Sequence, residues 1–350
     1  MVGAARRRTV KFGAAIDMGA RGDYNTEMKL KMKFKMKEPD INMKLKKILI
    51  ALAALALFAC VGTSAEGRLN VVAVNFPCYD FARQVLGDLG DATLLVHPGV
   101  EVHSYEPSPA DIIAIGEADL FVYIGGEGDT WVDNILSGFD ASEAPATLRM
   151  MDAVTPLEEE EHEHDHGHDH AEEGPEYDEH IWTSPKNAAA MVDALAAALQ
   201  AVDPEHADAY GENAAAYQAQ IEAVDGEIEA IVAGAARREL VFADRFPFLY
   251  FVRAYGLDYL AAFPSCTADT EPTPQTIMGL IDRVRQDGIP AVYTIELSSQ
   301  NVARTVAEET GAKILTLHSM QTVTQDEFDA GESYVSLMRG NVEALREGLN

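Results

Sequence analysis

Cysteine is scarce in this chain of 350 residues, which contains only Cys60, Cys78 and Cys266. The sequence has no CxxC pair and no other cysteine-rich pattern typical of a zinc site. Two thiols as distant as Cys78 and Cys266 can form a disulfide in an oxidising compartment, or they can stay apart. The sequence leaves both alternatives open.

Basic residues are also few. The chain has 27 Lys and Arg residues against 57 Asp and Glu residues, so its formal net charge is −30. So acidic a surface argues against nucleic-acid and anionic-membrane partners, and it favours the attraction of cations. Acidity alone would indicate only solubility, so it supports a cation-binding function without identifying one.

Long hydrophobic runs are missing apart from residues 48–58, which are too few for a comfortable transmembrane span. Met43 and the lysines after it precede this run, as in the basic and apolar regions of a secretory signal peptide. Residues 1–42 have basic runs and no apolar periodicity. We therefore predict that they are an upstream extension and that Met43 is the true start. A basic leader with its own function is the alternative.

The predicted signal peptide, residues 43–59, ends in Leu-Phe-Ala before Cys60. This ending resembles a bacterial lipobox, which implies cleavage before Cys60, a diacylglyceryl anchor on its sulfur and a tether over residues 60–67. Ordinary cleavage after Ala65 is the alternative, because Thr-Ser-Ala also satisfies the small-residue rule. Either way, the mature chain is predicted to lie outside the cytoplasm.

A histidine-acid tract is the most distinctive internal feature. It lies within residues 158–173, a segment with almost no apolar side chains, which predicts a mobile loop. Neutral imidazole is the commonest protein ligand for zinc, so the tract indicates accessory metal collection. Its five imidazoles belong to His162, His164, His166, His168 and His170.

Short apolar runs alternate with helical patterns, which favours parallel α/β sheets. Between two groups of such runs, one helix is predicted from Ser184-Pro185 to Gln200, and another from Pro204 to about Ala235. The second helix, of roughly 30 residues, would span about 45 Å. We predict two lobes, residues 68–203 and 237–350, joined by a helix over residues 204–236. The predicted strands are residues 69–75, 93–96, 120–124, 240–243, 259–263, 291–295 and 313–317.

Two histidines occupy similar positions just before a predicted helix. His103 precedes Ser108-Pro109, which begins a helix with Asp111 in its first turn, and His180 precedes Ser184-Pro185. His103 also follows a predicted strand, where open α/β sheets present ligands. A single loop histidine is usually just exposed. Two such junctions in one lobe favour a binding site.

The segments around these histidines, PGVEVHSYEPSPAD at 98–111 and DEHIWTSPKN at 178–187, resemble the two signatures of the zinc/manganese solute-binding proteins of ABC importers (cluster A-I, ZnuA-like family). The resemblance covers essentially all of residues 68–350. It implies two α/β lobes joined by a rigid helix and a metal in the cleft between them. It also implies delivery of that metal to a membrane permease driven by a cytoplasmic ATPase. His103 and His180 match the first two metal ligands of the family.

The second lobe departs from the family pattern. Arg245 occupies the usual position of the third ligand, and a guanidinium has no lone pair for a metal. In the turn after the last strand, where the family usually has an aspartate, His318 could restore three imidazoles. Glu271 and Glu296 are carboxylates in second-lobe loops, and we consider Glu271 a further candidate ligand. A structural ion pair between Glu271 and Arg245 is the alternative.

The predicted function is extracytoplasmic capture of Zn²⁺, without catalysis, by a monomer that delivers the ion to an ABC permease. Mn²⁺ is the alternative cargo, although three imidazoles favour zinc over manganese. Two other classes remain open: an extracellular zinc hydrolase, which would need an open coordination position and a base, and a surface sensor or adhesin that uses metal structurally.

Overall fold

The computed structural model describes residues 68–140, 142, 144–159, 176–263, 266 and 272–350. The predicted leader, signal peptide and lipidation site at Cys60 lie outside the described residues, as do the five histidines of the tract and Glu271. None of the helices in the described ranges combines the length and the apolar character that crossing a membrane requires.

The described chain forms two four-stranded sheets, and every strand pair in them is parallel. The strand orders are β2-β1-β3-β4 and β6-β5-β7-β8, so the two sheets have the same topology. The predicted pair of parallel-sheet α/β lobes is therefore confirmed. The strands are β1 (Leu69–Ala73), β2 (Gly90–Leu94), β3 (Leu120–Tyr123), β4 (Ala146–Arg149), β5 (Glu239–Phe242), β6 (Asp258–Ala261), β7 (Ala291–Thr294) and β8 (Lys313–Thr316).

All seven predicted strands are present, within a few residues of their predicted ends. They were recognisable because parallel strands covered on both faces consist of nearly continuous apolar residues. All four residues of β7, for example, are buried. Strand β4 was missed because its sequence, Ala-Thr-Leu-Arg, has no apolar run; the edge strands β6 and β8 also have no buried residue, but apolar runs mark them in the sequence.

Helices connect the strands, and several begin where sequence signals place them. Ser108 and Asp111 form a reciprocal capping box at the start of α3. Pro185 is the first residue of α5, although the Ser184 side chain makes no capping hydrogen bond. The helices are α2 (Phe76–Leu86), α3 (Pro109–Gly116), α4 (Trp131–Leu136), α5 (Pro185–Val202), α6 (Ala207–Gly234), α7 (Leu249–Tyr255), α8 (Pro274–Asp287), α9 (Asn301–Thr310), α10 (Gln325–Ala330) and α11 (Tyr334–Gly348).

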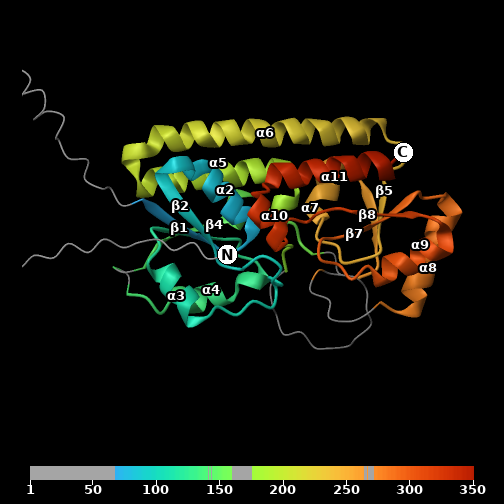
Figure 1. Cartoon of the computed structure of the whole chain (residues 1–350), viewed down its shortest axis with the longest axis horizontal. Helices are drawn as coiled ribbons and strands as arrows, with labels where there is room; N and C mark the ends of the chain where they lie inside the picture. Colours follow the sequence, from blue (N-terminus) through green and yellow to red (C-terminus); the bar gives the residue numbers. More distant parts are fainter. Residues whose placement is uncertain (1–67, 141, 143, 160–175, 264–265, 267–271) are drawn as a thin grey trace, which may run out of the picture. The chain divides into compact units, whose positions relative to one another are not determined.

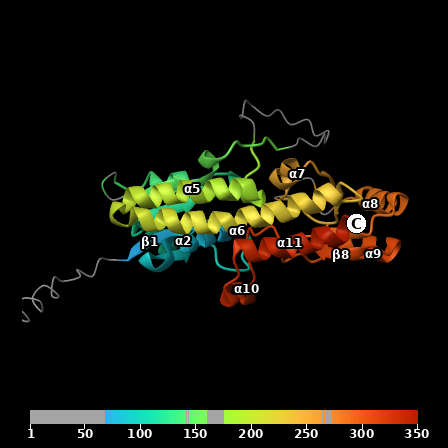
Figure 2. The same ribbon diagram turned by 90° about the horizontal axis from the view of Figure 1, so that it is seen from above.

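The predicted joining helix is α6, whose 28 residues extend over about 42 Å. It contacts α2 and α5 of the first lobe and α11 of the second, as the two ribbon views show (Figure 1, Figure 2). Its buried side chains recur every three or four residues from Tyr210 to Val232, which is the spacing of one helix face. One continuous helix thus packs against both lobes.

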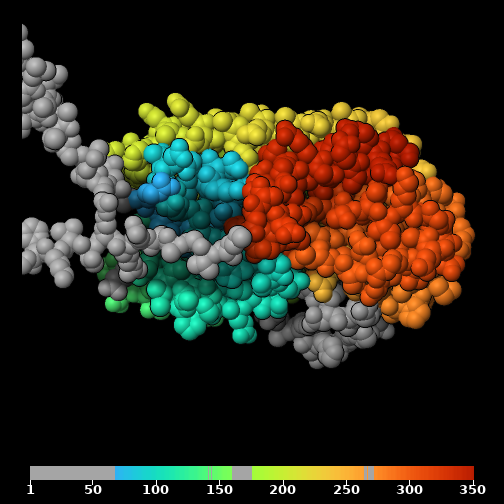
Figure 3. All heavy atoms as spheres, viewed as in Figure 1, coloured from blue at the N-terminus to red at the C-terminus, as the bar shows by residue number. Residues whose placement is uncertain are grey.

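The end of the chain returns to the first lobe. The guanidinium of Arg83 in α2 donates to the carbonyls of Gly331 and Glu332, just before α11. The rings of Tyr79 and Phe328 lie 5.4 Å apart between α2 and α10. In the space-filling view the red C-terminal residues lie directly against the blue-to-cyan residues of the first lobe (Figure 3). The lobes are therefore connected by both α6 and the α10–α11 segment.

Candidate metal centre

Three potential metal ligands converge where the two lobes meet. The imidazoles of His103 and His180 and the thiol of Cys266 each offer a ligand atom, and these atoms lie within 4.8 Å of one another. His103 lies in the loop between β2 and α3, His180 immediately before α5, and Cys266 between β6 and α8. The first lobe therefore supplies two donors, and the second supplies one.

The two histidines are oriented by the two residues that precede His180. The Nδ1 atom of His180 lies 3.1 Å from Oδ1 of Asp178, and the Nδ1 atom of His103 lies 3.0 Å from Oε1 of Glu179. A carboxylate at Nδ1 holds the proton there and leaves the Nε2 lone pair for a metal. The Nε2 atom of His180 is buried and has no hydrogen-bond partner among the described residues.

These carboxylates are themselves held in place. The backbone N–H of Gly128 donates to Glu179 (2.8 Å), and a Cβ atom on Gly126 would collide with the Glu179 side chain. The Tyr250 hydroxyl donates to the carbonyl of Asp178 (2.8 Å). The glycine-rich turn at residues 125–128 therefore accommodates a carboxylate of the site.

The electrostatics of the centre favour a thiolate beside imidazolium rings. Burial works against the charged form of His103, but the nearby Cys266 thiol and Glu179 carboxylate outweigh it and raise the His103 pKa to about 9. Burial likewise opposes ionisation of Cys266, yet the charge of His180 and the proximity of both imidazoles lower the Cys266 pKa. The pKa of His180 is raised despite its burial, mainly by the charge of Asp178. A cation could replace the protons that this group holds.

Gln321, which sequence reasoning did not single out, borders the same centre. Its Nε2 atom lies 2.8 Å from Nε2 of His103, and its Oε1 atom lies 3.8 Å from Sγ of Cys266. It follows β8, directly after Met320, whose φ of 63° is in the left-handed region. The amide is therefore within reach of two of the three candidate ligands.

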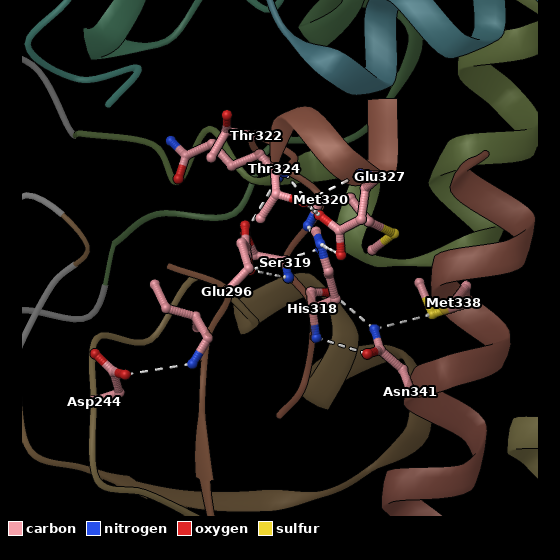
Figure 4. A network of polar contacts seen from close by, with 12 residues as sticks. Asp244, Glu296, His318, Ser319, Met320, Thr322, Thr324, Glu327, Met338 and Asn341 are labelled. Carbon is pink, nitrogen blue, oxygen red and sulfur yellow. Dashed lines mark hydrogen bonds and ion pairs between the residues drawn. The ribbon is translucent and has the colours of Figure 1, made fainter. Parts of the chain in front are cut away.

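His318 lies outside this cluster, and its ring nitrogens face other groups (Figure 4). Its Nδ1 atom accepts the backbone N–H of Met320 (2.9 Å) and lies 3.7 Å from Oε2 of Glu296, while Nε2 lies 3.6 Å from Oε1 of Glu327. The pKa of His318 is raised, because the nearby carboxylates outweigh its burial. Where a third imidazole was predicted, the structure brings the Cys266 thiol to the centre, and His318 instead contacts α10.

The two cysteines of the described chain are both free and buried. Cys78 lies in the hydrophobic core of the first lobe, whereas Cys266 lies beside two imidazoles. The sequence left open whether these two cysteines form a disulfide or stay apart, and in the structure they are separate thiols. The disulfide between Cys78 and Cys266 is absent from it.

Arg245 pairs across the lobes with Glu101, whose Oε2 atom lies 3.2 Å from Nη1 of Arg245. Both side chains line a cavity of about 420 Å³, which Gln321 also borders. The alternative of an ion pair between Arg245 and Glu271 stays a prediction, because Glu271 is not among the described residues.

One signal could have identified Cys266. It follows β6 as His103 follows β2, and ligands of parallel sheets gather beyond the carboxyl ends of strands. A thiolate is also a common zinc ligand. The signal was weak because cysteines in zinc sites usually occur in pairs, and no pair exists here.

Comparison with known proteins places the chain in a family. The family model described as zinc-uptake complex component A, periplasmic (ZnuA), matches residues 71–348. The chain belongs to this family. It is 34% identical over 308 residues to the zinc-binding lipoprotein AdcA of Streptococcus pneumoniae, covering 87% of this chain but only 60% of that relative. It is 31% identical to the high-affinity zinc uptake system protein ZnuA of Bacillus subtilis, covering 86% of this chain and 96% of that one.

A solved structure supports the same assignment. The Zn(II)-bound ZnuA-like domain of Streptococcus pneumoniae AdcA superposes with a TM-score of 0.68 at 30% identity, covering 81% of this chain and 99% of that domain. The described part of this ZnuA-family chain therefore corresponds to the ZnuA-like portion of the longer relative.

Proposed function

We propose that this protein captures Zn²⁺ outside the cytoplasm and delivers it to the permease of an ABC importer, with His103, His180 and Cys266 as metal ligands. The observation that carries the proposal is the convergence of these three donors at one point between the lobes. The names of the AdcA and ZnuA relatives, both of which refer to zinc, support the choice of ion.

The donor distances are compatible with zinc after a small closure. Zn–N bonds of about 2.0 Å and Zn–S bonds of about 2.3 Å in a tetrahedron place neighbouring donors roughly 3.5 Å apart. Donor atoms within 4.8 Å of one another therefore need to approach by at most about 1.3 Å. The Gln321 amide oxygen, a water or a carboxylate would complete four ligands.

The division of ligands between lobes suits a carrier that must release its cargo. If the lobes separate, Cys266 leaves the metal while both histidines stay on the first lobe. Two imidazoles hold zinc less tightly than three or four ligands, so separation at the permease would lower affinity. The family's role in metal uptake favours this carrier over the hydrolase.

The surrounding assembly follows from the same proposal. A monomer is tethered to the membrane through lipid on Cys60 and works with a permease and its cytoplasmic ATPase. The lipoprotein relative supports the anchor. In this proposal the histidine tract gathers metal weakly. The described residues on either side of it, Glu158 and Tyr177, pair with each other, and Tyr177 directly precedes Asp178. The tight site then holds one ion.

Calorimetric titration of the full chain with Zn²⁺ tests the proposal. We expect one tight site plus weaker sites, and His180→Ala should abolish the tight phase because it removes a buried donor. His97→Ala is the matched control, since His97 is an exposed loop histidine of the same lobe. Tight binding that survives His180→Ala would contradict the assignment. Deletion of residues 160–170 should lower the stoichiometry and leave the tight site.

A further inference from the structure

The centre combines donors of different softness. Two imidazole nitrogens and one thiolate sulfur converge, and the amide of Gln321 lies beside two of them. Thiolate sulfur is a soft donor that favours Cu⁺ and Zn²⁺, whereas Mn²⁺ prefers carboxylate, carbonyl and water oxygens. Two histidines and one cysteine, with a weak fourth contact from glutamine, form a set that copper proteins also use.

Resting on the proposed metal-binding function, we propose that this centre is a thiophilic-metal site that accepts Cu⁺ as well as Zn²⁺ and discriminates against Mn²⁺. Cys266 determines this selectivity, because it is the sulfur donor in the group of three. The inference extends the cargo of the site beyond zinc and identifies the residue responsible.

The geometry suits an ion that needs few ligands. His180 and Cys266 are only 3% and 6% exposed, and the buried Nε2 atom of His180 has no partner among the described residues. Three strong donors in a buried site can satisfy Cu⁺ in a trigonal arrangement, with Gln321 as a weak fourth contact. Zn²⁺ would instead need a full fourth ligand.

The position of Cys266 distinguishes it from an ordinary buried thiol. Cys78 is equally buried, but it packs in the hydrophobic core, and its pKa is raised mainly by burial. Cys266 instead lies beside the imidazoles of His103 and His180 and the amide of Gln321. Imidazoles and amides are polar groups that can bind a metal.

Binding of Cu⁺ requires no electron transfer. A Cu–S bond and two Cu–N bonds form, while the protons on the ligating nitrogens of the two imidazolium rings leave to solvent; Cys266, already a thiolate, loses none. Copper supplied as Cu⁺ stays Cu⁺.

The first test is metal competition on the full chain. Cu⁺ added anaerobically to zinc-loaded protein should release the tightly bound Zn²⁺, measured with a chromogenic zinc indicator, whereas Mn²⁺ should release none. Cys266→Ser should weaken Cu⁺ binding by at least about 100-fold, since loss of a ligand should cost no less than loss of an outer-shell partner. Cys266→Asp should weaken Cu⁺ and strengthen Mn²⁺ binding. Cys78→Ser is the matched control and should behave as wild type.

A second measurement needs no Cys266 variant, so it does not depend on whether Cys266→Ser folds. Co²⁺ bound in place of Zn²⁺ to the wild-type protein should show a thiolate-to-cobalt charge-transfer absorption, and Cys78→Ser should retain it. Absence of this absorption, or unchanged Cu⁺ affinity in folded Cys266→Ser, would overturn the inference. A wild-type protein that shows no tight Zn²⁺ binding would instead overturn the proposed function. The two failures are therefore distinguishable.

Discussion

Asp80 should be among the most sensitive positions for stability, because its buried carboxylate joins three helices. It is 0% exposed in α2. Its Oδ2 atom accepts the hydroxyl of Tyr217 in α6 and the backbone N–H of Tyr334 at the start of α11 (2.8 Å). Its Oδ1 atom accepts Nε of Arg83 (2.7 Å). One side chain therefore connects the first lobe, the long helix and the C-terminal helix of the second lobe.

Asp80→Ala should destabilise the protein by about 3–5 kcal/mol. The change leaves the Tyr217 hydroxyl and the Tyr334 N–H buried without an acceptor, at roughly 1–3 kcal/mol each, and breaks the ion pair with Arg83. At about 2–4 °C per kcal/mol for a protein near this size, the melting temperature should fall by roughly 6–20 °C.

Differential scanning calorimetry and urea unfolding measure this change. The matched control is Asp91→Ala, which removes an ion pair between two exposed side chains, Arg68 (55% exposed) and Asp91 (65% exposed), and should change stability little. If Asp80→Ala destabilises no more than Asp91→Ala, the three-helix connection does not contribute as argued.

Three further predictions concern the metal centre. Asp178→Asn should weaken zinc binding about 10- to 100-fold in calorimetry, because it perturbs the partner of His180 Nδ1; an unchanged affinity would argue against that role. Tyr250→Phe should lower the free energy of unfolding by about 1–3 kcal/mol in urea, since its hydroxyl accepts the N–H of Leu157 and donates to the Asp178 carbonyl. Apparent zinc affinity should rise with pH toward about 9, because zinc must displace the proton of His103, whose pKa is raised to about 9. Affinity that is constant from pH 7 to 9 would contradict this proton competition.

The fold was largely predictable because its signals are local. Buried parallel strands consist of apolar runs, and proline at the first turn marks the start of α3 and α5. The long helix α6 follows from an apolar spacing of three and four residues. Strand β4 was unpredictable because its four residues, Ala-Thr-Leu-Arg, do not form an apolar run.

The centre was only half predictable, for a physical reason. His103 and His180 belong to one lobe and to recognisable helix-start segments, so the sequence places them near each other. Whether Cys266 or His318 reaches them depends on how a second-lobe loop approaches the first lobe, which no local pattern encodes. His318 has suitable chemistry, but its ring faces Glu296 and Glu327.

The supporting contacts indicate how capture and release could divide between the lobes. Asp178 and Glu179, next to His180, orient the two imidazoles from within the first lobe, and the glycines at 126 and 128 accommodate Glu179. Most supports of this half of the centre thus come from the first lobe, and Tyr250 of the second lobe adds a hydrogen bond to the Asp178 carbonyl. The second lobe adds the thiol of Cys266, so approach of the lobes would change both the number of ligands and their softness. Affinity and metal selectivity would then be controlled by the same closure, because both depend on whether the sulfur reaches the ion.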